Sequence, residues 1–182
     1  MEYTASLDQA WSEITKLTQE NHTLRFLGDE YSIDLSKKQV FSASCNIPAK
    51  PFYSILLLHY LAKKLNGLAP VKEKWMAFQE LPGGQGYYSA FKKRVIDTII
   101  RKYGASPEQL LELSERFTAK KTDTADSSVV LEVLAGVPVL INLWRGDEEF
   151  SPSANVLFDQ SIKDIFCTED VVVLAEIVAH SL

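Results

Sequence analysis

Apolar residues recur at two different spacings in the first third of the chain. From Ser6 to Glu20 they recur every three or four positions, which predicts an amphipathic helix with Ser6 as its N-cap. From Leu24 to Ser44 apolar and polar residues alternate on either side of polar turns. This alternation predicts two or three short antiparallel strands.

Three helical segments follow in the middle of the chain. Residues 51–67, PFYSILLLHYLAKKLNG, are apolar nearly all round and predict a largely buried helix that stops at Gly67. The Gly-rich stretch ELPGG then opens a second helix that extends to about Tyr103. A third helix is predicted from Ser106, with Ser106 as its cap and Pro107 at its first position.

Residues 127–144, SSVVLEVLAGVPVLINLW, give the strongest hairpin pattern, and Thr168 opens a last helix. The polar stretch 119–128 is expected to be the most flexible segment. Strands and helices come in blocks, which predicts an α+β fold. We expect a single domain over residues 1–182, with an antiparallel sheet of hairpins packed against four or five helices. Eight side chains should be largely buried: Phe52, Leu56, Tyr60, Leu131, Leu140, Leu143, Leu174 and Ile177.

Charge is distributed unevenly along the 182 residues. The net charge is −5, which argues against a nucleic-acid binder. Residues 60–121 carry 12 Lys and Arg against 6 Asp and Glu, whereas residues 122–182 carry 2 against 11. We favour complementation of these segments within one fold over two oppositely charged faces.

No apolar run has the length of a membrane span, and the acidic N-terminus lacks the pattern of a signal peptide, so a cytoplasmic protein is expected. The two cysteines, Cys45 and Cys167, are expected to be inert buried thiols.

The stretch WRGDEEF places three carboxylates, Asp147, Glu148 and Glu149, between two aromatic residues. Together with Asp159 they could hold a hard cation through oxygen ligands, although the run does not match an EF-hand loop. A general acid and base pair is a second possibility, since the carboxylate spacing is not fixed by sequence. A plain polar turn between two strands is the third.

The ELPGG turn raises a related question, because a glycine loop before a helix exposes N–H groups that suit an anion. Neither a P-loop nor a dinucleotide-binding pattern is present, and a tight backbone turn is the simpler interpretation. Both turns are flanked by large aromatics. We therefore put forward the hypothesis of one joint ligand site built from the two turns: Trp75, Glu80, Pro82, Gly83, Gly84, Tyr87, Trp144, Asp147, Glu148, Glu149, Phe150 and Asp159. The isolated histidines predict no metal site, and His59 is expected to be a hydrogen-bonded residue of the helix.

Several stretches resemble one uncharacterised prokaryotic family, the domain of unknown function three-seven-eight-six, found mainly in anaerobic bacteria and archaea. They include YSILLLHYLAKKLNG, KWMAFQELPGGQGYYSAF, CTEDVVVL and the region around WRGDEEF, and the resemblance extends from about Leu24 to Leu174. The resemblance implies a setting in anaerobic cofactor metabolism, with corrinoid or iron–sulfur proteins as neighbours. It supplies no catalytic residue. The chain has no cysteine cluster of its own, so any iron–sulfur module would belong to a partner.

Two functions from different classes remain open. The first is a soluble, non-enzymatic binding or accessory protein for a small ligand, a cofactor such as a corrinoid or another tetrapyrrole, or a partner protein that carries a cofactor. The alternative is a metal-assisted enzyme that uses the carboxylates of Asp147, Glu148, Glu149 and Asp159. A purely structural interaction module would explain the uneven charge but not the glycine turn. The sequence fixes neither the cofactor nor the oligomeric state.

Overall fold

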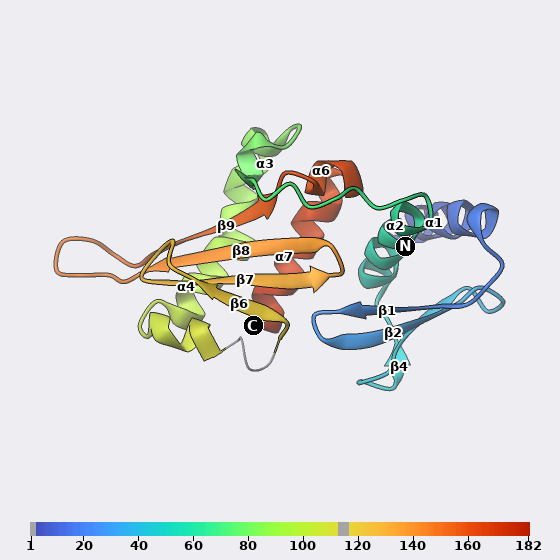
Figure 1. The fold of residues 1–182 in the computed structure, drawn as a ribbon, viewed down its shortest axis with the longest axis horizontal. Helices are drawn as coiled ribbons and strands as arrows, with labels where there is room; N and C mark the ends of the chain where they lie inside the picture. Colours follow the sequence, from blue (N-terminus) through green and yellow to red (C-terminus); the bar gives the residue numbers. More distant parts are fainter. Residues whose placement is uncertain (1–2, 113–116) are drawn as a thin grey trace.

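The computed structural model describes residues 3–112 and 117–182. Two antiparallel sheets, each with its own helices, lie side by side along the long axis of the molecule (Figure 1). In the N-terminal unit, two helices pack together over a four-stranded sheet with the order β1-β2-β3-β4. Its elements are α1 (Thr4–Leu17), β1 (His22–Phe26), β2 (Asp29–Asp34), β3 (Gln39–Ser42), β4 (Ile47–Pro48) and α2 (Pro51–Leu65).

Residues 66–74 cross without regular structure to the C-terminal unit, whose five-stranded sheet has the order β5-β9-β8-β7-β6. Helices cover one face of this sheet (Figure 1). The elements before the central hairpin are β5 (Trp75–Ala77), the 3₁₀ turn η1 (Phe78–Glu80), α3 (Gly84–Phe91), the π-helical turn η2 (Lys92–Ile96), α4 (Asp97–Tyr103), the 3₁₀ segment η3 (Pro107–Glu112) and β6 (Ala119–Thr122). The remainder are β7 (Ser127–Leu134), β8 (Val137–Trp144), β9 (Ser153–Asp159), α6 (Ile162–Ile165) and α7 (Thr168–Ser181).

The central hairpin explains the apolar runs of the sequence. Strand β8 lies in the middle of the five-stranded sheet, between β7 and β9, and is buried along most of its length. A strand with neighbours on both sides and burial on both faces favours a continuous β-branched and aliphatic sequence over an alternating one. Gly136 forms the β7–β8 turn with φ of +76°, a backbone conformation that is strained for any residue with a side chain.

The two units meet through a small number of specific contacts. The backbone N–H of Leu27, just after β1, donates to the carbonyl of Val133 in β7 at 2.9 Å. From α2, the hydroxyl of Tyr60 donates to the carbonyl of Ala135 at 2.7 Å, and His59 pairs with Asp170 of α7. Buried side chains from both units form one continuous hydrophobic cluster. The units therefore share a core even though their sheets are separate.

The α+β class and the antiparallel pairing are confirmed, as are the helix after residue 50, the long helix to Tyr103, the central hairpin and the last helix. The structure has two sheets where we expected one, because segment 66–74 carries the chain away from β4 and β5 pairs with β9. Of the eight expected core residues all but the half-buried Phe52 are buried. Helix α1 begins at Thr4 after Tyr3, so Ser6 is not its cap.

Three other expectations were wrong or incomplete. The stretch expected to be flexible contains β6, an edge strand whose exposed lysines are typical of a protected sheet edge. The sequence pattern did not reveal β5 or β9. Instead of an α-helix from Ser106 the described residues form η3, and the rest of that prediction, residues 113–116, lies outside the described part.

Charge complementation between segments is visible in two ion pairs. Lys72 pairs with Asp164, and Arg94 Nη1 lies 3.8 Å from Glu176 Oε2, so each pair joins the positive middle segment to the acidic C-terminal third. Within residues 3–112 and 117–182, no helix combines the length and the apolar character that crossing a membrane would require.

Candidate functional site

The acidic turn between β8 and β9 closes on itself. Asp147 Oδ1 accepts hydrogen bonds from the backbone N–H groups of Glu149 (2.9 Å) and Phe150 (2.7 Å), and the Asp147 N–H donates to the Phe150 carbonyl (2.9 Å). These two donors hold the pKa of the Asp147 carboxyl below its usual value. The side chains of Glu148 and Glu149 are exposed. The Asp147 carboxylate therefore serves the backbone N–H groups of its own turn.

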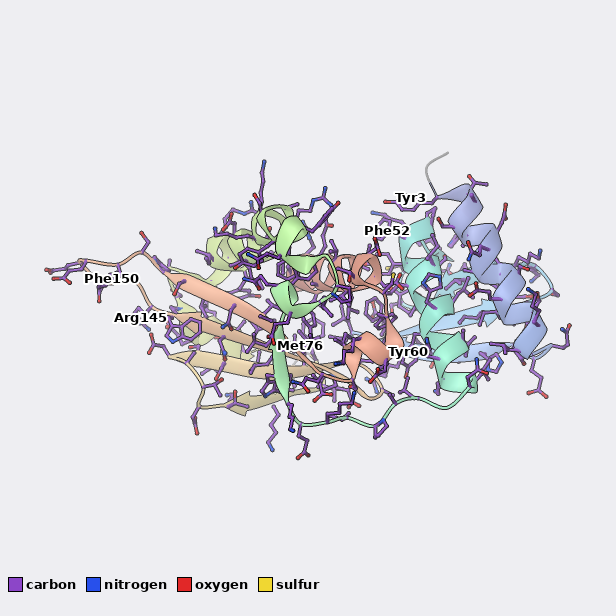
Figure 2. The ribbon with its side chains drawn as sticks, turned by 90° about the horizontal axis from the view of Figure 1, so that it is seen from above. Tyr3, Phe52, Tyr60, Met76, Arg145 and Phe150 are labelled. Atoms are coloured by element: carbon purple, nitrogen blue, oxygen red, sulfur yellow. The ribbon has the colours of Figure 1, made fainter. Side chains whose placement is uncertain are left out.

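The base of this turn is fastened to the rest of the C-terminal unit. The Arg145 N–H donates to Asp126 Oδ2 at 2.8 Å, and Arg145 Nη2 donates to Glu108 Oε2 at 2.7 Å. An open hollow of about 450 Å³ lies beside it, lined by residues 104–105 and 145–152. The loop projects from the end of the sheet, and Figure 2 shows Phe150 near its tip, where 69% of the residue is exposed.

Asp159 lies elsewhere and has a structural role. It is 1% exposed at the end of β9. Its Oδ1 accepts from the N–H of Lys72 (2.9 Å) and from the N–H (2.9 Å) and hydroxyl (2.6 Å) of Ser161, and its Oδ2 accepts from the N–H of Lys74 (3.1 Å). Burial raises its pKa, but these four donors outweigh that effect and leave the pKa lowered. The carboxylate clips segment 66–74 to the sheet.

The ELPGG turn is also explained by local packing. Glu80 Oε1 accepts from the Ala77 N–H at 2.6 Å and thereby closes η1. Gly83 has φ of +74°, and a Cβ on Gly84 would lie 2.1 Å from the Phe78 carbonyl oxygen, so both positions require glycine. The Pro82 carbonyl accepts from Thr168 Oγ1 at 2.8 Å, which ties the turn to the start of α7.

The hypothesis of one joint site is wrong. The segment α3–η2–α4 is continuous from Gly84 to Tyr103, and such a helix is roughly 30 Å long. The ELPGG turn lies at its start, whereas Gly104 at its end lies against Pro152 of the acidic turn. Asp159 is separated from the acidic turn by the length of β9, about 20 Å. The four carboxylates of the metal-assisted alternative are therefore not assembled, and among the described residues no group of three or more His, Cys, Asp and Glu side chains is arranged to hold a metal ion.

The aromatics of that hypothesis are scattered too. Trp75 of β5 lies opposite Asp159 of β9 and is 36% exposed. Tyr87 on α3 is 50% exposed. Trp144 pairs with Ser153 at the base of the acidic turn. None of these three lines the same hollow as Phe150, whose neighbours are the residues of its own loop and of the α4 end.

A different site lies between the two units, where α2 and the β1–β2 turn face α7. It consists of two adjoining cavities of about 340 and 400 Å³ that share Tyr53 and His180. We call this pair the inter-unit cleft. The first cavity is lined by Tyr3, Lys50, Phe52, Tyr53, Val173, Glu176, Ile177 and His180. The second is lined by Arg25, Phe26, Leu27, Gly28, Asp29, Tyr31, Tyr53, Phe117, His180 and Ser181.

Aromatic rings in contact build the N-terminal wall of the cleft. Tyr53 stacks on Tyr31 with centroids 6.2 Å apart and meets Phe26 edge-on at 5.9 Å. Phe52 lies 5.1 Å from Tyr53 and 6.3 Å from Tyr3, and Figure 2 shows Tyr3 and Phe52 at the same edge of this unit. Such rings offer rigid apolar surface at a low cost in conformational entropy.

The hydroxyls in the cleft stay protonated at neutral pH. Burial raises the pKa of Tyr31 to about 12, with the charges of neighbouring groups as smaller causes. Burial also raises the pKa of Tyr53, although a hydrogen bond with Ser181 opposes the effect. His180 Nδ1 lies 2.7 Å from the Glu176 carbonyl oxygen, which can only accept, so Nδ1 carries the proton of this bond. The cleft thus presents phenol O–H donors and an imidazole whose Nδ1–H is already bound to a backbone carbonyl.

The comparisons with known proteins bear on the whole chain. A family model described as Domain of unknown function (DUF3786) matches residues 10–181. The chain belongs to this family. The resemblance seen in the sequence is thereby confirmed and extends further toward both ends than its motifs. No curated protein and no solved structure matches this chain.

One further group in this family member brings a thiol, a carboxylate and an imidazole together. Asp170 accepts from Cys167 Sγ (3.3 Å) and pairs with His59 Nδ1 (2.9 Å), as expected for a hydrogen-bonded His59. The Asp170 carboxylate thus accepts hydrogen bonds from both the thiol and the imidazole. Desolvation and then the Asp170 charge raise the pKa of Cys167 to about 11, which disfavours a nucleophilic thiolate. Both cysteines are exposed, so their predicted burial was wrong.

The cleft residues were missed by sequence reasoning. The one usable signal was the aromatic pair Phe52-Tyr53 at the start of α2, on a helix otherwise rich in aliphatics. Nothing in the sequence linked this pair to Arg25, Tyr31 or His180, which come from distant segments.

Proposed function

We propose that this protein is a non-enzymatic binding protein that holds a small ligand in the inter-unit cleft. The observation that carries the proposal is the pair of adjoining cavities that share Tyr53 and His180. Concave sites between structural units, with apolar walls and a few convergent polar groups, are where small molecules bind most often. A cytoplasmic location, expected from the sequence pattern, and a role in anaerobic metabolism, which the family resemblance implies, are part of the proposal.

The chemistry of the cleft favours binding over catalysis. A catalytic acid or base needs a pKa near the working pH, whereas burial moves the pKa of Tyr31 and Tyr53 away from neutrality. Raised phenol pKa values keep the hydroxyls as hydrogen-bond donors, which suits recognition of a ligand. The same reasoning applies to the Cys167 thiol outside the cleft.

The size of the cleft limits the ligand. The two volumes, about 340 and 400 Å³, lie near the lower end of the range of roughly 300–1,000 Å³ that is typical of small-molecule sites. The shared Tyr53 and His180 also divide the space. A corrinoid or another tetrapyrrole, with its broad macrocycle and side chains, does not fit such a divided cleft, so we propose a smaller ligand.

A ligand that is retained on purification tests the proposal. Native mass spectrometry of the wild-type protein should detect a stoichiometric small molecule that denaturation releases. Val173→Trp and Ser181→Trp place a large side chain at partly exposed positions of the cleft and should abolish its retention. Ser89→Trp on the exposed side of α3 is the matched control and should retain it. Equal retention by all four proteins would place the ligand elsewhere, and a wild-type protein without any retained molecule would speak against the proposal.

A further inference from the structure

We infer that the ligand of the inter-unit cleft is a planar molecule that carries an oxyanion, either a carboxylate or a phosphate. This inference rests on the proposed function and adds the chemical class of the ligand. It draws on the arrangement of charges around the cleft and on the different character of its two cavities.

Two cations line the cleft without a carboxylate partner. Neither Arg25 nor Lys50 forms an ion pair with any described residue. Arg25 Nε donates to the Gly28 carbonyl at 3.2 Å, which holds the side chain at the β1–β2 turn and leaves its terminal N–H groups for another acceptor. The Lys50 ammonium lies 5.9 Å from the centre of the Phe52 ring, at the mouth of the first cavity.

Two acidic groups also line the cleft, and among the described residues Glu176 is paired with a cation whereas Asp29 has a neutral hydroxyl partner. Glu176 pairs with Arg94 of η2, with 3.8 Å between Arg94 Nη1 and Glu176 Oε2. Asp29 Oδ1 accepts from the Ser44 hydroxyl at 2.8 Å. Three cations (Arg25, Lys50 and Arg94) therefore stand against two carboxylates (Asp29 and Glu176), which leaves one positive charge in excess around the cleft.

The two cavities differ in a way that fits a ligand with two ends. The first is walled mainly by Phe52, Val173 and Ile177, which suits a flat apolar ring. The second is the more polar one: it holds the guanidinium of Arg25, the carboxylate of Asp29 and the hydroxyl of Tyr31, whose raised pKa keeps it a donor. Tyr53 and His180 belong to both. A ring in the first cavity would direct its substituent past Tyr53 toward Arg25, where an oxyanion accepts charge-assisted hydrogen bonds.

Four matched probes separate the ring from its charge: 2-naphthoate, 2-naphthyl phosphate, neutral 2-naphthamide and cationic 2-naphthylmethylammonium. Binding to the full-length protein is measured by isothermal titration calorimetry and by ¹H–¹⁵N chemical-shift mapping. At least one anionic probe should bind about ten-fold or more tightly than the amide, because one charge-assisted bond accounts for roughly that factor. The stronger of the two anions distinguishes a carboxylate ligand from a phosphate ligand. Arg25→Gln should lower the affinity for that anion about ten-fold and leave the affinity for the amide unchanged.

Two further variants separate the possible failures. Arg101→Gln changes an exposed arginine of α4 that lies outside the cleft, and it should leave every affinity unchanged. Ser181→Trp should abolish binding of all probes that occupy the cleft. If probes bind in a manner sensitive to Ser181→Trp but the amide or the cation binds as tightly as the anions, the oxyanion inference is wrong while ligand binding stands. If no probe binds, or if Ser181→Trp has no effect, ligand binding in the cleft itself is refuted.

Discussion

Asp159→Ala should be among the most destabilising single substitutions in the chain, although Asp159 at first resembles a site residue. The carboxylate is 1% exposed and accepts four hydrogen bonds, three from backbone N–H groups and one from the Ser161 hydroxyl. Without this carboxylate, the backbone N–H groups of Lys72 and Lys74 can bond only to water. The N–H and hydroxyl of the buried Ser161 are left without an acceptor. Each buried donor left without an acceptor costs about 1–3 kcal/mol, so the free energy of unfolding should fall by roughly 3–5 kcal/mol.

Asp159→Asn sharpens the test because it keeps the shape of the side chain. One amide oxygen can still accept from Ser161 and Lys72, but the amide NH₂ then faces the Lys74 N–H, and two donors repel. We expect a loss of roughly 2–3 kcal/mol, smaller than for alanine. Urea denaturation followed by circular dichroism gives both values. Asp164→Ala is the matched control, because it removes a partly exposed surface carboxylate from the same Lys72 and should cost no more than about 1 kcal/mol.

The pH dependence gives a second readout for Asp159. Its pKa is lowered in the folded protein, so its contribution to stability is complete above the unfolded value of about 3.9 and disappears as the pH falls through the folded value. Asp159→Ala should therefore flatten the acid side of the stability profile. If Asp159→Ala lowers the free energy of unfolding by less than about 1 kcal/mol and leaves the acid side of the profile unchanged, then the Asp159 carboxylate does not hold segment 66–74 against β9.

Three further predictions follow from burial and backbone geometry. Leu56→Ala should lower the free energy of unfolding by roughly 2–5 kcal/mol, because Leu56 is 0% exposed; a loss below about 0.5 kcal/mol would contradict this. Gly83→Ala should destabilise by about 1 kcal/mol because of its positive φ, whereas Gly86→Ala, in α3 with open space around it, should stabilise by about 0.5–1 kcal/mol; opposite shifts in melting temperature check the pair. The Asp170 hydrogen bond raises the pKa of His59, so the contribution of this pair is complete below about pH 6.5 and is lost as the pH rises through the folded pKa. His59→Gln should remove that loss from the stability profile, and an unchanged profile would show that the pair does not couple folding to pH.

The elements that could be predicted from sequence are those with a strong local signal. Strands β7 and β8 carry long β-branched runs around Gly136, and α2 begins at Pro51 and ends before Gly67. Their periodicity is set by the element itself. Strand β5 has only three residues, and its existence depends on pairing with β9 across the fold. A segment that short has no period of its own, so its partner decides its structure.

The two turns show how composition alone misleads. Three adjacent carboxylates at 147–149 suggested a compensating cation, but one of them is compensated by N–H groups of its own turn. The glycines at 83 and 84 suggested a ligand approaching the backbone, but the group that approaches Gly84 is the Phe78 carbonyl. In both turns the sequence correctly indicated an unusual local requirement. The group that meets this requirement belongs to the protein itself and not to a ligand. Local patterns identify a backbone or charge problem without identifying what solves it.

The inter-unit cleft depends on a step that no local pattern describes, the docking of two units. Arg25 lies beside the cleft because the β1–β2 turn meets β7 through the Leu27 N–H, and His180 lies there because α7 packs beside α2. The same dependence gives the cleft a physical property that the two turns lack. Both units contribute to its walls, so a ligand that touches both walls stabilises their docking. Ligand binding should therefore strengthen the whole fold by mass action, since the unfolded chain has no cleft to bind it. A probe that fills the cleft should raise the melting temperature in proportion to the logarithm of its concentration, and Ser181→Trp should remove that rise. A probe that leaves the melting temperature unchanged would show that it does not bind the folded cleft in preference to the unfolded chain.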